Sequence, residues 1–166
     1  MKRVSPFIER NGLLVSPADG TTLALDAVAV CSVDSVLAGV CDAQSGVPAV
    51  ERGGAAVVAV PIPEQMVLLS DGAFNEQFLA TVRLYLKQLE KCGIWALLLP
   101  DDASVSVVVH AARRVKDCTA VVGVVLPPEF TIAGAAKATA LIAALTEKHG
   151  DYHYFSAVAG GMAVGG

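Results

Sequence analysis

The chain has 166 residues, a length that fits one domain able to bury about two-thirds of the surface that its unfolded form would expose. Hydrophobic residues make up 54% of it and charged residues 17%, and the net charge of −4 argues against the concentrated basic surface that binds nucleic acid. The N-terminus has no apolar stretch of signal-peptide length, and no run anywhere reaches the length of a membrane span. The four cysteines lack Cys-x-x-Cys spacing, which predicts reduced thiols in the cytoplasm, and no membrane partner is expected.

The first 54 residues predict β-hairpins. The pair Asn11-Gly12 stands between two apolar segments, and both central positions of a two-residue hairpin turn need a positive φ, which Asn and Gly tolerate. Residues 21–31 are expected to form one long strand. Residues 33–41 fit either a helical turn or another strand.

Three apolar, β-branched runs mark the part of the chain from residue 55 to residue 159. Each ends at a proline that an acid follows, in residues 55–64, 94–102 and 120–129. The runs show no alternation of apolar and polar residues, which is typical of strands buried on both faces, and proline is tolerated at a strand end. We therefore expect buried strands that point the same way and end at one edge of a sheet.

The segments between these strands predict helices. From residue 74 to residue 91, apolar side chains recur every three or four positions, and Gly93 should follow the helix end. Weaker helical patterns occupy residues 103–115 and 131–150. Residues 65–69 are expected to be extended.

The C-terminal residues predict a strand and a glycine-rich tail. Residues 152–158 read as an edge strand. The tail, residues 160–166, would be disordered in isolation, so we expect a neighbouring subunit to hold it where it is ordered. Together with the low charge of the chain, this favours a homo-oligomer or a protein partner.

The order of elements predicts a single α/β domain over residues 1–166, with a hairpin-rich part (1–54), an alternating strand and helix part (55–159) and the tail. The expected sheet is βαβαβαβ, parallel or mixed, with helices packed on it. The same order also resembles an acetyltransferase-like α+β fold. Catalytic members of that fold carry an Arg/Gln-x-x-Gly-x-Gly/Ala loop before the central helix, where this chain has Leu-Ser-Asp-Gly-Ala-Phe-Asn at residues 69–75, so the resemblance extends to the fold alone.

Four acids follow the apolar strands: Glu64, Asp101, Asp102 and Glu129. Ligands of open parallel sheets bind outside the carboxyl ends of the strands, where these acids would converge. Carboxylates that lie close together shift each other's pKa and suit a divalent cation such as Mg²⁺ or Ca²⁺, so they are candidate catalytic residues. In the alternative interpretation, Asp101 and Asp102 cap the next helix while Glu64 and Glu129 are solvated loop acids.

A second candidate site follows the last predicted helix. His149, Asp151 and His153 stand at two-residue steps, which on a strand would place them on one face, and zinc favours nitrogen ligands with a carboxylate. In the alternative interpretation, Gly150 ends the helix and leaves His149 on it. A divalent cation is thus the one cofactor that the sequence indicates.

Two further groups favour structural interpretations. His110 lies among apolar residues and reads as a partly buried helical histidine rather than a general base. The basic residues Arg113, Arg114 and Lys116 read as a solvated helix C-terminus rather than a phosphate site, because the helix dipole favours cations there.

No nucleophile elbow, P-loop or dinucleotide-binding pattern occurs in the chain. The sequence therefore predicts a small cytoplasmic α/β domain that works by binding or assembly, as an oligomer or by docking on a protein partner, with a small-molecule ligand as a further option. The alternative function is a metal-assisted or carboxylate acid-base enzyme, for example a hydrolase, acting on a small polar or phosphorylated molecule at the strand ends. Whether the protein is an enzyme stays open at this point.

Overall fold

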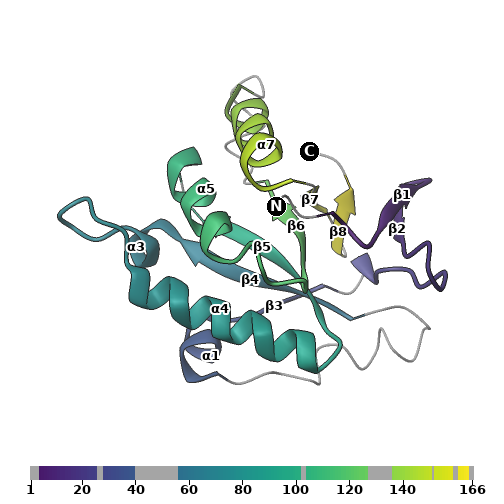
Figure 1. Cartoon of the computed structure of the whole chain (residues 1–166), viewed down its shortest axis with the longest axis horizontal. Coiled ribbons are helices and arrows are strands. Elements are labelled where there is room, and N and C mark those ends of the chain that lie inside the picture. Colours follow the sequence, from purple (N-terminus) through teal and green to yellow (C-terminus); the bar gives the residue numbers. More distant parts are fainter. Residues whose placement is uncertain are drawn as a thin grey trace.

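The computed structural model describes residues 4–25, 28–39, 56–101, 104–126, 136–150, 152–158 and 161–164. They form one α/β domain with a two-stranded antiparallel hairpin and a six-stranded sheet (Figure 1). The elements, in chain order, are β1 (Ile8–Arg10), β2 (Leu13–Val15), β3 (Ala29–Val30), α1 (Val33–Ala38), β4 (Val57–Pro63), α3 (Glu64–Val67), α4 (Glu76–Lys91), β5 (Trp95–Asp101), α5 (Val105–Arg114), β6 (Val121–Val125), α7 (Ala136–His149), β7 (His153–Val158) and β8 (Gly161–Val164).

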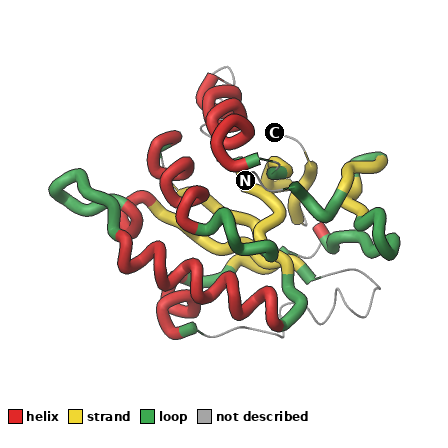
Figure 2. Tube along the Cα trace, viewed as in Figure 1, coloured by secondary structure: helices red, strands yellow, loops and turns green. Residues whose placement is uncertain are grey.

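The five strands from β3 to β7 are parallel and lie in the sheet in the order of the chain, and β8 pairs with β7 in the antiparallel direction. Parallel strands in sequential order, joined by right-handed crossovers, place every connecting helix on the same face of the sheet. Figure 2 shows the helices gathered together and the N-terminal hairpin apart from them. The α/β prediction is therefore confirmed, with a largely parallel sheet.

Side chains of neighbouring residues in the strands belong to two separate hydrophobic cores. Val58 and Leu98 pack with the buried faces of the helices, whereas their neighbours Val57 and Leu97 pack with Phe7 and other residues of the N-terminal segment. Because both faces are covered, the strands carry apolar side chains on both sides, which is why they show no alternation in the sequence.

Local signals account for several elements. Asn11 and Gly12 both have positive φ, 54° and 77°, in the turn that joins β1 to β2. Helix α4 begins at the N-cap Asn75, whose side chain accepts a hydrogen bond from the Phe78 amide at 3.1 Å, and the left-handed Gly93 follows it. The hairpin and this helix confirm the predictions made from the sequence.

In the first half of the chain, the structure differs from two predictions and decides a third that the sequence left open. The strand expected over residues 21–31 is reduced to Ala29–Val30, with one isolated bridge between Val15 and Thr22. The open segment 33–41 begins as a helix, α1. Residues 65–69 were expected to be extended, but the chain turns into α3 directly after Pro63, and this single turn buries Val67 completely.

Two predictions at the C-terminal end are also corrected. Strand β7 is an inner strand, because it pairs with β6 on one side and β8 on the other. Residues 161–164 of the tail, expected to be disordered in isolation, form β8, which pairs with β7 of the same chain. The edge of β7 offers unpaired backbone groups, and the tail satisfies them.

Strands β6 and β7 approach each other closely at one glycine. A Cβ atom added at Gly123 would lie 1.9 Å from the backbone oxygen of His153, its partner residue in β7. Only glycine fits at this position of the sheet.

Candidate functional site

Of the four predicted acids, the structure describes the side chain of Glu64 alone. Its Oε1 atom accepts a hydrogen bond from the Ser104 amide at 3.3 Å, just before α5, where Ser104 makes no capping bond through its own side chain. The backbone of Asp101 lies beside Pro63 in the sheet, so the ends of β4 and β5 share one edge. Asp102 and Glu129 fall outside the described residues.

The predicted metal ligands His149 and His153 lie on different elements. His149 is the last residue of α7, and His153 opens β7. The Nε2 atom of His153 lies 3.0 Å from both the Ser5 hydroxyl and the Phe7 carbonyl oxygen. Hydrogen bonds of this ring therefore connect the N-terminal segment to β7. Asp151 lies outside the described residues, and within the described part of the chain no group of three metal-ligating side chains comes together.

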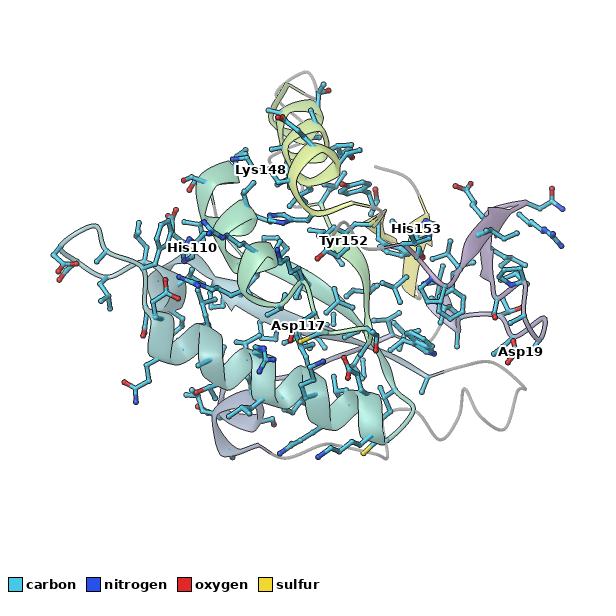
Figure 3. All side chains as sticks on the ribbon, viewed as in Figure 1. Asp19, His110, Asp117, Lys148, Tyr152 and His153 are labelled. Atoms are coloured by element: carbon cyan, nitrogen blue, oxygen red, sulfur yellow. The ribbon has the colours of Figure 1, made fainter. Side chains whose placement is uncertain are left out.

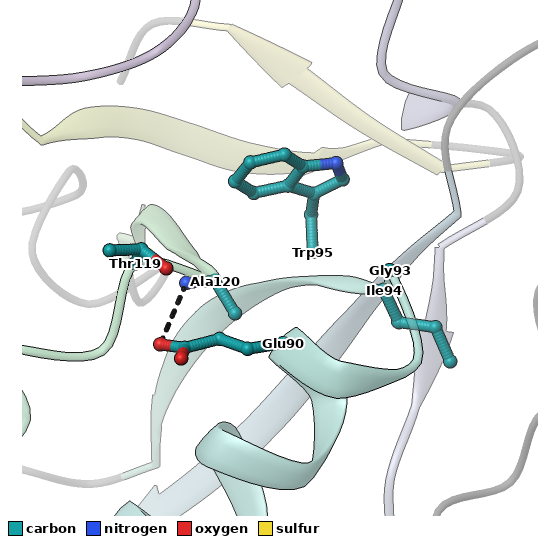
Figure 4. Close-up of a pocket in the computed structure, with 6 residues that line it drawn as sticks. All are labelled: Glu90, Gly93, Ile94, Trp95, Thr119 and Ala120. Carbon is teal, nitrogen blue, oxygen red and sulfur yellow. Dashed lines mark hydrogen bonds between the residues drawn. The ribbon is translucent and has the colours of Figure 1, made fainter.

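A small hollow lies where β5 and β6 begin (Figure 4). Its volume of about 70 Å³ is well below the roughly 300–1,000 Å³ of pockets that hold metabolites. Glu90 is the acid in it, and this carboxylate already accepts a bond from the Ala120 amide at 3.4 Å and contacts Lys87. The hollow therefore does not qualify as a functional site.

A larger groove of about 540 Å³ lies along helices α5 and α7, with the loop before α4 at one end. We call it the α5–α7 groove. Helix α5 contributes one stripe of side chains at three- and four-residue spacing, and α7 contributes its last two turns. The lining residues are Phe74, Val105, Ser106, Val109, His110, Arg113, Ala144, Lys148 and His149.

His149 is the most unusual side chain of this groove. It is only 4% exposed, and neither ring nitrogen has a partner at regular hydrogen-bond geometry within the described residues, although the Val109 backbone makes a polar contact with the ring outside that geometry. Burial lowers the pKa of His149; the Val109 carbonyl opposes this effect, and the positive charges of Lys116, Lys148 and Arg113 reinforce it. A buried neutral imidazole without a well-formed hydrogen bond at either nitrogen is costly in a native protein.

His110 is held on the same groove by two contacts. Its ring stacks on Phe74, with centroids 3.7 Å apart and planes only 4° from parallel. Its Nε2 atom lies 2.8 Å from Glu76 Oε1, and Arg114 binds the same carboxylate with Nε at 2.8 Å. The hydrogen bond from Arg114, followed by that from His110, outweighs desolvation and lowers the pKa of Glu76.

Figure 3 shows His110 and Lys148 on the two neighbouring helices, α5 and α7. The groove thus combines basic side chains, two histidines and an apolar lining. Sequence reasoning considered His110, Arg113 and His149 one at a time and did not place them together. The stripe along α5 was visible in the sequence, but nothing local in the chain pointed to α7 as its neighbour.

No protein-family model matches the chain, and no curated protein matches it. In the described residues, no helix is both long enough and apolar enough to cross a membrane. The geometry of the groove is therefore the basis for a functional proposal.

Proposed function

We propose that the protein is a cytoplasmic binding domain and that its ligand is a small molecule held in the α5–α7 groove. The observation that carries this proposal is His149, a side chain 96% removed from solvent that lines a groove of metabolite size and has no well-formed hydrogen bond at either ring nitrogen within the described residues. A ligand that exchanges a hydrogen bond with this ring would offset the cost of burying it.

The experiment is a screen of small neutral, anionic and cationic compounds against the full-length ¹⁵N-labelled chain by NMR. Binding in the groove is expected to shift the amide signals of Val109, Ala144 and His149 and to leave those of the hairpin unchanged. Compounds that shift only signals elsewhere, or none at all across the screen, would refute the proposal.

A pair of alanines in α7 supplies a matched control. Ala144 lines the groove, whereas Ala143 is exposed on the same helix outside it. Ala144→Trp should fill the groove and abolish binding, while Ala143→Trp should bind as the wild type does. Circular dichroism of both variants shows whether the fold survives. Equal loss of binding in two folded variants would contradict the location of the site.

Docking on a protein partner, or assembly with a second copy, is the second candidate function. It is favoured by exposed apolar side chains on β3, α1 and α4, where Val30 is 59%, Leu37 49% and Leu84 61% exposed. Sedimentation velocity at high concentration tests the assembly form, because a monomer at all concentrations would exclude it. The enzyme alternative has less support, since Glu64 is engaged with the backbone of Ser104.

A further inference from the structure

The charges around the α5–α7 groove indicate the class of molecule that it holds, an inference that rests on the proposed function. Arg113 and Lys148 line the groove, and Lys116 acts with them on His149. Helices α5 and α7 both end here, and each C-terminus carries about half a negative charge. Three side-chain cations exceed this total of about one negative charge, so the end of the groove is positive.

The acid that faces α5 does not cancel this excess. Glu76, which faces α5 from the start of α4, is bonded to His110 and Arg114. Among the described residues, neither Arg113 nor Lys148 makes an ion pair, and both side chains are exposed. The two cations that line the groove are thus available to an anion.

The rest of the groove is apolar. Val105, Val109 and Ala144 contribute aliphatic surface, and Phe74 adds an aromatic ring whose orientation is set by its stack on His110. Inorganic phosphate or another bare anion would leave this surface in water. An organic anion would cover it and gain the favourable free energy of removing apolar surface from water.

We propose that the α5–α7 groove binds a small organic anion, with its carboxylate or phosphate group between Arg113 and Lys148 and its apolar body against Val109 and Ala144. His149 lies within the same site and supplies one hydrogen bond to the polar end of the ligand. Carboxylate and phosphate ester share the chemistry that the groove recognises, and separate probes distinguish them.

The test measures dissociation constants of the full-length chain for three probes of nearly the same shape: 2-naphthoate, 2-naphthyl phosphate and neutral 2-naphthamide. At least one anion is expected to bind about tenfold more tightly than the amide, with affinity that falls as salt is added. Lys148→Met should weaken anion binding about two- to fivefold, as expected for an exposed charge, and the double change of Arg113 and Lys148 to Met about tenfold. Binding of the amide should change little.

Lys91→Met is the matched control, because Lys91 also lies in the last turn of a helix, α4, but away from the groove. It should leave all three affinities unchanged. If 2-naphthamide binds in the groove as tightly as both anions, or if Lys91→Met weakens anion binding as much as Lys148→Met, the anion proposal is wrong while the binding function stands. If no compound of the wider NMR screen reaches the groove, the binding function itself fails.

Discussion

Replacing His149 by leucine should make the protein more stable. The substitution removes two buried ring nitrogens that have no well-formed hydrogen bond in the described residues and keeps a side chain of similar size. An unsatisfied buried polar group costs about 1–3 kcal/mol, and part of the gain is lost to imperfect packing of the new side chain. We expect the free energy of unfolding to rise by about 1–2 kcal/mol, which corresponds to a Tm increase of about 2–8 °C in a domain of this length.

The pH dependence provides a second measurement on the same variant. Because burial lowers the pKa of His149 in the folded state, the unfolded chain takes up a proton that the native chain resists. The contribution of His149 to the free energy of unfolding is constant when the pH is well above the unfolded pKa of about 6.5. The free energy of unfolding decreases as the pH falls below this value. The positive charges of Lys116, Lys148 and Arg113 strengthen the effect. The advantage of His149→Leu should therefore grow as the pH falls from 7.5 toward the lowered pKa.

Urea denaturation at pH 7.5, 6.5 and 5.5 measures both effects, with the Ala143→Trp variant as a control for a change on α7 outside the groove. The reasoning would be refuted if His149→Leu were less stable than the wild type by more than about 1 kcal/mol at pH 7.5. Such a result would mean that the ring is hydrogen-bonded in solution. The stabilised variant should also have lost affinity for anionic ligands, since it lacks the hydrogen bond.

Three further predictions concern the fold. Gly123→Ala should destabilise the protein by about 3 kcal/mol or prevent folding, because its Cβ would collide with the backbone of His153; a wild-type urea midpoint would contradict the close approach of β6 and β7. Burial raises the pKa of Cys118 to about 12, so a thiol reagent at pH 8 should label the exposed Cys92 within minutes and Cys118 only with unfolding, as mass spectrometry of peptides would show. Asn75→Ala should lower the free energy of unfolding by about 1 kcal/mol, whereas Asn75→Asp, which keeps a capping oxygen, should not.

Much of the fold follows from patterns within short stretches of sequence. The Asn11-Gly12 turn and helix α4 depend on backbone preference, capping and periodicity, all of which act within a few residues. The apolar runs around β4, β5 and β6 predict strands that are covered on both faces. Their order along the chain, alternating with helices, is enough to predict a parallel sheet.

The helical turn α3 and the strand β8 could not be predicted from short stretches of sequence. Residues 65–69 are apolar enough for a strand, but α3 forms a single helical turn that ends at Val67 and buries this side chain in the core. The tail 161–164 has almost no side-chain signal, and its strand forms because β7 presents unpaired backbone groups at the edge of the sheet. In both cases the partner comes from another part of the chain.

The candidate site shows the same division. The sequence predicted that His110 and Arg113 lie on one helix and that His149 stands at the end of another, because the helical patterns and Gly150 are local signals. Three features depend on tertiary contacts: α5 packs beside α7, His149 is buried without a well-formed hydrogen bond in the described residues, and Arg113 and Lys148 line the same groove. The reason is physical: burial and the field of several charges depend on distances between segments more than 30 positions apart, and no local preference encodes those distances.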